Sequence, residues 1–346
     1  MIDQPVQSED AHDVTRTMRA IVQDRYGEAG EVLHPERIDR PEPGDGEVLL
    51  RVHAVGLERG LWHSMTGLPY PFRLITGIRT PRTRVRGREV AGRVAALGAG
   101  VTGFQPGDEV VGVVGISEGA FAEYAVARAN KLVPKPANVT FEQAAAVPIS
   151  GLTALQAVRD AGMVQPGQRV LVIGASGGVG TFAVQIAKAF GAEVTGVCSA
   201  AKVDLVRSIG ADHVIDYSRA EITDAGKRYD VIIDIGGHRP LGLLRQALIP
   251  RGRLVIVGSE TGGRWLGGLD RQIRAALLSP FIGQKLIWFF SPERAADMAA
   301  MIELVESGTV TPAVERTYPL EETAAAVQHM AEGRARGKVV VTVSQR

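Results

Sequence analysis

A glycine-rich segment at residues 174–180, Gly-Ala-Ser-Gly-Gly-Val-Gly, constrains the fold of this chain more than any other feature. The apolar run at residues 169–174 predicts a buried strand that leads into it, and residues 181–190 predict a helix that follows it. A strand, a tight glycine turn and a helix in this order are typical of the first unit of a parallel α/β sheet. The segment therefore predicts a doubly wound sheet with helices on both faces.

Aligned on its last glycine, the same segment reads Ala-x-Gly-x-x-Gly, a dinucleotide-binding fingerprint with Ala175 at the first position. Gly177 would let the backbone approach a pyrophosphate, and Gly180 would let the helix pack closely on the strand. The helix N-terminus would add backbone N–H groups and the positive end of the helix dipole. The pattern favours a dinucleotide site, with a purely structural turn as the alternative.

The end of the next predicted strand, residues 193–197, indicates which dinucleotide binds. Between this strand and Asp204 there is no carboxylate that could hold the ribose hydroxyls of NAD. Ser199 and Lys202 could hold a 2′-phosphate instead. The sequence therefore predicts NADPH as the cofactor, and a Lys202 that is only a solvated helix residue is the alternative.

Composition excludes several other classes of protein. Lys and Arg number 39 against 38 Asp and Glu, a formal charge of +1, which argues against a dedicated nucleic-acid or membrane-surface protein. The single cysteine, Cys198, excludes an internal disulfide framework and a multi-cysteine metal site. The seven histidines show no ligand spacing, so no bound metal is expected.

Two segments bear on location and membrane contact. Residues 1–17 are polar and acidic and predict a flexible extension with no secretory signal, which favours a cytoplasmic protein. The most apolar stretch, residues 275–290, is interrupted by Pro280 and Gly283 and is too short to span a bilayer. It favours a helical lid or a subunit contact, and a membrane-touching patch is the less favoured alternative.

The chain divides into two parts with different sequence patterns. Short β-rich runs separated by turn residues predict a compact β-barrel-like domain first, at residues 48–57, 89–98, 108–115 and 120–127. Thr140 and Gln143 have the spacing of a capping box and begin an alanine-rich helical stretch. Strands alternating with helices then predict the parallel sheet, at residues 169–174, 193–197, 213–217, 230–235 and 253–258. A last strand at residues 338–343 is expected to return to the first domain.

Further motifs along the chain carry a resemblance to a known family. They read GREVAGRV, GVTGFQPGDEV, GAFAEY, AAAVPISGLTALQA, GADHVIDY and ARGKVVV, at residues 87–94, 100–110, 119–124, 144–157, 210–217 and 335–341. With the glycine turn they cover nearly the whole chain from residue 18. The chain resembles the zinc-free branch of the medium-chain dehydrogenase/reductase superfamily, the quinone oxidoreductase-like proteins. Within that branch it is similar to the reductases like the mitochondrial reticulon-4-interacting protein. Arg88 stands where zinc-dependent relatives have the histidine of a Gly-His-Glu ligand motif, which agrees with a zinc-free protein.

The resemblance implies an α/β chain of two domains. A GroES-like β-barrel catalytic domain would comprise residues 18–140 and 312–346. A doubly wound Rossmann domain that binds NADPH would comprise residues 141–311. Relatives usually form homodimers through the nucleotide domain, so a homodimer is expected.

The resemblance also implies cofactor contacts at matching positions. The phosphate and adenosine contacts would be Ser176, Gly178, Val179, Ser199, Lys202 and Tyr217. The strand ends along the cofactor would be Ile235, Gly236, Val257 and Gly258, and Thr153 and Lys338 would line it further. Phe281 and Ile282 are expected at the cofactor and acceptor pocket with Leu277 and Trp288, unless these residues form a dimer contact. A plain core Tyr217 and a solvated strand-edge Lys338 are the alternatives.

Two departures from the family pattern fall near the expected reaction cleft. Relatives show G-V-N-R-G-D-W, where this chain has Glu58 in place of the Asn and Leu61 in place of the Asp. Relatives also show D-N-V-G-G, where this chain has Asp-Ile-Gly-Gly at residues 234–237. These departures leave the acceptor open.

Hydride chemistry without zinc favours an activated acceptor. Hydride added to a conjugated C=C bond leaves an enolate that hydrogen-bond donors can stabilise, whereas an unactivated alcohol is hard to oxidise. The sequence therefore favours NADPH-dependent reduction of a quinone or an activated C=C bond in a small molecule. His63 is the first candidate proton donor and Tyr70 the second, with a purely structural histidine as the alternative. A reductase of a specialised enone, imine or enoyl thioester and a non-enzymatic NADPH-binding redox sensor are the alternative functions.

Six arginines lie within residues 73–88. Such a cluster could guide an acidic substrate or cover the cofactor phosphates. A solvated loop beside the barrel is the favoured interpretation.

Overall fold

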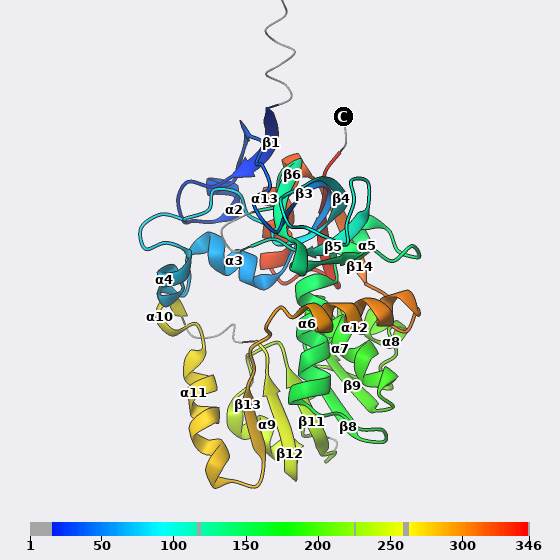
Figure 1. The fold of residues 1–346 in the computed structure, drawn as a ribbon. Helices are drawn as coiled ribbons and strands as arrows, with labels where there is room; N and C mark the ends of the chain where they lie inside the picture. Colours follow the sequence, from blue (N-terminus) through cyan, green and yellow to red (C-terminus); the bar gives the residue numbers. More distant parts are fainter. Residues whose placement is uncertain (1–15, 116–118, 225, 259–262, 345–346) are drawn as a thin grey trace, which may run out of the picture.

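The computed structural model describes residues 16–115, 119–224, 226–258 and 263–344. Figure 1 shows two lobes, with a parallel sheet and most of the helices in the lower one and a mainly antiparallel sheet in the upper one. This is the α/β architecture that the sequence predicts, a β domain joined to a Rossmann-type domain.

The lower sheet has the strand order β10-β9-β8-β11-β12-β13, and every pair in it is parallel. Its strands are continuous apolar runs because helices cover both faces, and Val170, Leu171 and Val172 of β8 are fully buried. The chain order reverses between β8 and β11, and ligands bind at such a switch point. The strands are β8 (Arg169–Ile173), β9 (Glu193–Cys198), β10 (His213–Asp216), β11 (Tyr229–Asp234), β12 (Leu248–Ile256) and β13 (Lys285–Trp288).

The upper sheet runs β14-β15-β3-β4-β5-β7, and β6 also pairs with β3. The strands are β3 (Glu47–Gly56), β4 (Glu89–Leu97), β5 (Glu109–Val113), β6 (Tyr124–Arg128), β7 (Leu132–Pro134), β14 (Val314–Pro319) and β15 (Lys338–Thr342). The expected return of the last strand is confirmed, because Val341 of β15 lies opposite Val55 of β3. The sheet is therefore built from both ends of the chain.

A separate antiparallel pair, β1 (Thr17–Val22) and β2 (His34–Asp39), packs beside the upper sheet. Of the predicted extension, residues 1–15 lie outside the described residues, and Thr17 already belongs to β1.

The helices pack mainly on the lower sheet and at the junction of the lobes (Figure 1). They are α2 (Ala29–Val32), α3 (Arg59–Thr66), α4 (Arg73–Thr76), α5 (Phe141–Ala145), α6 (Pro148–Gln156), α7 (Gly178–Ala189), α8 (Val203–Ser208), α9 (Leu241–Ala247), α10 (Gly263–Leu266), α11 (Leu269–Leu278), α12 (Ala295–Glu306) and α13 (Thr323–Ala331). The predicted capping box is confirmed, because Thr140 and Gln143 each accept a hydrogen bond from the backbone N–H of the other at the start of α5. Among the described residues, no helix is long and apolar enough to cross a membrane.

The apolar stretch 275–290 is a helix only at its beginning. Helix α11 ends at Leu278, a single 3-10 turn occupies Ser279–Phe281, and the rest forms β13 on the edge of the parallel sheet. Pro280 and Gly283 end the helical pattern, and Leu286 can then pack into the apolar core beside β12. The expectation of one helical segment is therefore wrong for its second half.

Candidate active site

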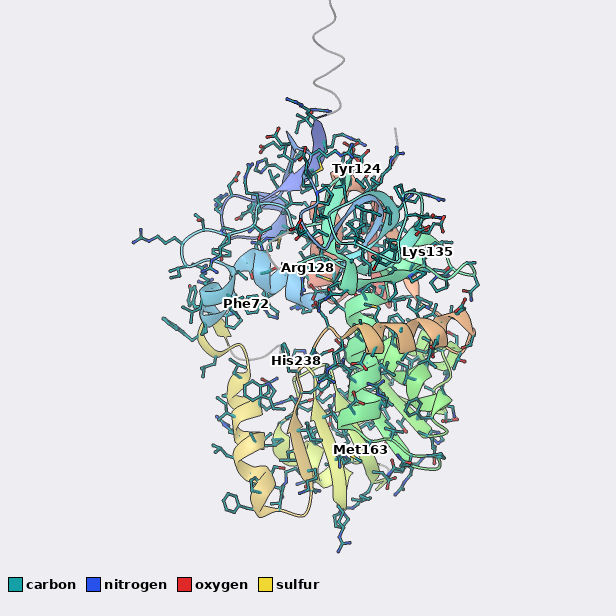
Figure 2. The ribbon with its side chains drawn as sticks, viewed as in Figure 1. Phe72, Tyr124, Arg128, Lys135, Met163 and His238 are labelled. Carbon is teal, nitrogen blue, oxygen red and sulfur yellow. The ribbon has the colours of Figure 1, made fainter. Side chains whose placement is uncertain are left out.

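A cavity of about 590 Å³ lies between the two lobes. One wall consists of the carboxyl ends of β8, β9, β11 and β12 with the start of α7. The other consists of residues from α3 and α6, from the link between β3 and α3, and from the segment before β15. His238, which follows β11, lines this cavity, and Figure 2 shows it at the level where the two lobes meet. Both lobes thus contribute side chains to one cavity.

The turn after β8 has the geometry of a phosphate cradle. Gly174 has φ +84°, which favours glycine, and a Cβ on Gly180 would lie 2.0 Å from the carbonyl oxygen of Gly174. Gly177 is the N-cap of α7 and provides no side-chain cap, so the first backbone N–H groups of this 12-residue helix remain for a ligand. Among the described residues, the nearest atom to a Cβ on Gly177 would be the carbonyl oxygen of Gly174, at 3.5 Å. These residues therefore fit a dinucleotide pyrophosphate.

The part of the cavity where the adenosine end of a dinucleotide is expected is lined by Ser199, Lys202 and Tyr217. The Nζ of Lys202 donates hydrogen bonds to the carbonyl oxygens of Gly333 at 2.8 Å and Ala335 at 2.7 Å, so Lys202 is not merely a solvated helix residue. Burial lowers the pKa of Lys202 below its usual range. Tyr217 is 54% exposed and is therefore not a core residue.

The cavity brings together most of the residues that the sequence singled out. These are His63, Thr153, Ser176, Gly177, Gly178, Val179, Ser199, Lys202, Tyr217, Ile235, Gly236, Val257 and Gly258. Ala175 and Gly180 are buried within the turn and shape it without lining the cavity.

Three of the expected site residues, Tyr70, Phe281 and Ile282, lie away from this cavity. Tyr70 packs edge-on against Trp265, with the ring centroids 5.2 Å apart, and does not line the cavity. Phe281 and Ile282 precede β13 at the amino end of the parallel sheet, whereas the cofactor edge is the carboxyl end. Ile282 lines a different depression, and Phe281 is 85% exposed. These positions correct the expectation that all three would contact cofactor or acceptor.

Lys338 is neither a cavity-lining residue nor a solvated one. Its side chain is 1% exposed, and its Nζ pairs with the carboxylate of Glu89 and donates to the carbonyl oxygen of Leu57 and to Ser150 Oγ. Glu89 also accepts hydrogen bonds from the backbone N–H groups of Ile149 and Ser150 at the start of α6. A buried ion pair with this many partners joins the two lobes behind the cavity.

Glu58 departs from the family pattern, which has Asn at this position, but the sequence alone indicates no role for it. Glu58 lines the cavity and is the N-cap of α3, where its carboxylate accepts a hydrogen bond from the backbone N–H of Gly60. Burial, and then the negative charge of Glu89, raise the pKa of Glu58 to about 7. Leu61, the other departure, is buried in the core of the upper lobe and does not reach the cavity.

His63 lies on α3 and lines the same cavity. Its Nδ1 is 2.8 Å from the carbonyl oxygen of Leu68, which can only accept, so Nδ1 carries the proton. The edge of the Trp62 ring packs against the imidazole, with the centroids 5.1 Å apart. His63 is therefore held in one orientation and one tautomer.

Arginines of the cluster at residues 73–88 form contacts within the upper lobe and at the junction of the lobes. Arg86 donates to Gln23, and Arg88 pairs with Glu293. Arg73 donates to the carbonyl oxygen of Gly67. Among the residues that the structure describes, none of the six arginines lines the cavity, so the expectation that they cover the cofactor phosphates finds no support.

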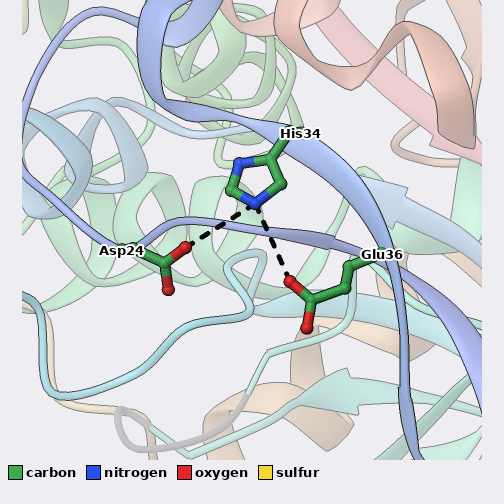
Figure 3. A group of neighbouring side chains, drawn as sticks. All are labelled: Asp24, His34 and Glu36. Atoms are coloured by element: carbon green, nitrogen blue, oxygen red, sulfur yellow. Dashed lines mark ion pairs between the residues drawn. The ribbon is translucent and has the colours of Figure 1, made fainter.

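Only one group of possible metal ligands occurs in the described part of the chain. Asp24, His34 and Glu36 lie together on the surface of the upper lobe, with His34 Nε2 at 3.6 Å from Asp24 and 3.7 Å from Glu36 (Figure 3). Arg84 pairs with the same two carboxylates at 2.7 and 2.8 Å. The group is thus an exposed ion-pair cluster in which Arg84 already occupies the place of a cation.

Comparison with known proteins gives consistent results. An alcohol dehydrogenase GroES-like domain matches residues 44–137, and a zinc-binding dehydrogenase domain matches residues 209–341. The chain is 31% identical over 336 residues to a chloroplast envelope quinone oxidoreductase homolog of Arabidopsis thaliana, a match that covers 94% of this chain and 98% of the relative. It is 36% identical over 276 residues to the mitochondrial NAD(P)H oxidoreductase RTN4IP1 of Mus musculus, covering 74% and 70%. The structure of the quinone oxidoreductase from Coxiella burnetii superposes with a TM-score of 0.81 at 26% identity, over 95% of this chain and 100% of that one.

Proposed function

We propose that this chain, an oxidoreductase that belongs to the quinone oxidoreductase-like family of medium-chain dehydrogenases/reductases, reduces a quinone or an activated C=C bond with NADPH and without a metal ion. The observation that carries the proposal is the cavity with a phosphate cradle on one wall and the ionisable side chains of Glu58 and His63 on the other. When bound, the dihydronicotinamide supplies the hydride, and the protein supplies orientation and electrostatics.

The adenosine end supports NADPH over NADH. An ammonium group has three donors, and the carbonyl oxygens of Gly333 and Ala335 take two of those of Lys202. The third donor and the hydroxyl of Ser199 would suit a 2′-phosphate. No carboxylate side chain follows β9 before Asp204, so nothing there would hold the ribose hydroxyls of NADH in the usual way.

A catalytic zinc ion does not fit the side chains of the cavity. Arg88 stands in place of a histidine ligand and pairs with Glu293. Cys198 lines the opposite, nucleotide wall, and burial and the nearby Asp216 raise its pKa to about 11, whereas zinc binds the thiolate. We therefore expect that dialysis against a chelator leaves both the turnover and the metal content, measured by elemental analysis, unchanged.

The lining of the cavity indicates what kind of acceptor it suits. The cavity mixes apolar residues such as Ile149 and Val179 with Glu58 and His63, which suits a flat acceptor with a polar carbonyl end. A specialised enone, imine or enoyl thioester is the second candidate, and the carboxyl group of Glu58 in the cavity is the observation that favours it.

The test measures binding first and turnover second. NADPH and NADH are titrated against wild type, Lys202→Ala and the control Lys188→Ala, whose lysine pairs with Asp212 outside the cavity. NADPH oxidation is then followed at about 340 nm with quinones, enones, imines and simple aldehydes. We expect NADPH to bind more tightly than NADH. Lys202→Ala, but not Lys188→Ala, should weaken that preference by about tenfold or more, because it removes one charge-assisted hydrogen bond to the 2′-phosphate. An NADH preference that Lys202→Ala does not alter would refute the cofactor assignment, and no turnover with any acceptor would refute the reaction.

We also propose that the chain forms a homodimer through β13. Among the described residues, no strand pairs with its outer edge. Leu277 and Phe281, which precede β13, and Trp288, which ends it, are 67%, 85% and 53% exposed. A second copy that covers this edge would hide these apolar side chains and could pair with the strand backbone, of which the N–H of Leu286 already donates to Ser279 Oγ. The double substitution Leu277→Asp/Phe281→Asp should give a monomer by light scattering, whereas Met163→Asp, at another exposed apolar residue, should not.

A cytoplasmic location stays a prediction of the sequence.

A further inference from the structure

We infer that Glu58 is the catalytic acid of this enzyme: its carboxyl group delivers the proton that completes reduction of the acceptor after hydride transfer. The inference rests on the proposed function, because it assigns a second residue role within the same reaction.

The placement of Glu58 gives its carboxyl group access to the acceptor. Glu58 lies on the catalytic-domain wall of the cavity, between Leu57 and Arg59, which also line it. A Cβ at residue 60 would lie 2.7 Å from Glu58 Oε2, so Gly60 leaves the space in which the carboxyl group folds back over the start of α3. One oxygen accepts from the N–H of Gly60, which fixes the group in one orientation. The side chain is therefore both held and facing the site.

The charges around Glu58 come from several elements. Glu89 on β4 disfavours a second negative charge, whereas Lys338 on β15 and Arg88 before β4 favour it. Lys338 is already paired with Glu89, and Arg88 with Glu293, so neither is a partner for Glu58 alone. Desolvation is the largest effect and, with Glu89, raises the pKa of Glu58 to about 7. A carboxyl group in this environment holds a proton near neutral pH and can release it, which an ordinary surface glutamic acid cannot do.

His63 is less suited to the same role. Its Nδ1 proton is engaged with the carbonyl oxygen of Leu68, so in the neutral imidazole the other nitrogen accepts a proton and does not donate one. His63 would have to be an imidazolium to act as the acid. Glu58 can donate a proton from its neutral carboxyl form.

When bound, the dihydronicotinamide would supply a hydride to the β-carbon of the acceptor: its C4–H bond would break, a C–H bond would form on the acceptor, and the acceptor would gain the two electrons that the cofactor loses. The π electrons of the acceptor move toward its carbonyl group and give an enolate. The O–H bond of Glu58 breaks, its proton forms a C–H bond at the α-carbon, and the carboxylate that remains takes a proton from water at the mouth of the cavity. For a quinone, the proton goes to the phenolate oxygen.

The test substitutes Glu58→Gln, which keeps the size of the side chain and an oxygen that accepts from Gly60 but cannot give up a proton. The control is Glu322→Gln, because Glu322 is also an N-cap residue, of α13, but is exposed and lies outside the cavity. With the acceptor that the wild type reduces best, Glu58→Gln should lower kcat by about 10²-fold or more and leave the NADPH affinity unchanged. The wild-type kcat should fall as pH rises through about 7, and this fall should be absent in Glu58→Gln and present in Glu322→Gln. Small carboxylic acids added to the buffer should restore part of the lost rate.

One further measurement separates this inference from the proposed function. Difference infrared spectroscopy should show a carboxylic-acid C=O band that disappears as pH rises through about 7 and is missing in Glu58→Gln, whether or not an acceptor is known. If the wild type turns over and Glu58→Gln has the same kcat and pH profile, Glu58 is not the acid and the proposed function survives. If the band is present but no acceptor supports NADPH oxidation, the proposed function fails and the catalytic role of Glu58 fails with it.

Discussion

Replacement of Glu58 by glutamine should stabilise the protein, and by an amount that grows with pH. The pKa of this carboxyl group is about 7 in the folded protein and 4.5 when the chain is unfolded. The folded state therefore binds more protons than the unfolded state between these values, so the stability that the protonated group provides is complete below about pH 4.5 and is lost as pH rises through about 7. Glutamine stays neutral throughout and has no such loss.

The size of the effect follows from the same two pKa values. A tenfold change in proton affinity corresponds to about 1.4 kcal/mol, so the whole difference is about 3 kcal/mol, of which about 2.5 kcal/mol develops between about pH 5 and about pH 8. Urea unfolding of wild type and Glu58→Gln at both pH values, at constant ionic strength, measures it, since all other titrating groups cancel in the comparison. A difference in unfolding free energy that is the same at both pH values would refute the argument, and Glu322→Gln should give that flat result.

Three more predictions follow from other contacts. Lys338→Met should lower the unfolding free energy by about 3–5 kcal/mol because it leaves the carboxylate of Glu89 buried without its cation, and adding Glu89→Gln should recover part of the loss in urea titrations. Gly177→Ala should weaken NADPH binding in a fluorescence titration and leave the melting temperature unchanged. Gly180→Ala should weaken NADPH binding and also lower the melting temperature, because its Cβ would lie 2.0 Å from a carbonyl oxygen. Cys198, with a pKa raised to about 11, should resist iodoacetamide near neutral pH until the protein is unfolded, as mass spectrometry would show.

The nucleotide wall of the site could be predicted from the sequence because its chemistry is local. Residues 174–180 carry the turn and the start of the helix in one continuous segment, and the strand before them sets their place at the sheet edge. Ile235 and Val257 follow two further apolar strands, and parallel strands bring their carboxyl ends to the same edge. Here, position in the sequence determines position in space.

The catalytic wall could not be predicted in the same way, because packing between distant segments builds it. Nothing near Lys338 in the sequence indicates that its ammonium group turns inward, since its partners are Glu89 and the start of α6. The acidity of Glu58 likewise depends on burial and on Glu89, which is distant along the chain. Phe281 and Ile282 were misplaced because the apolar pattern of residues 275–290 does not show that the chain turns between α11 and β13, which leaves both residues at the amino end of the sheet.

The pairing of β15 with β3 also sets an order for biosynthesis. A ribosome makes β3 before the parallel-sheet lobe and β15 after it. The strands of the parallel sheet are contiguous in the chain, so this sheet can form while translation continues. Strand β3 can pair with β15 only after β15 has been synthesised. A premature stop shortly before Lys338 would therefore leave the glycine turn intact and Glu89 without its buried cation. Such a truncated chain should retain the cradle for a dinucleotide and lose the lobe on which the reaction depends.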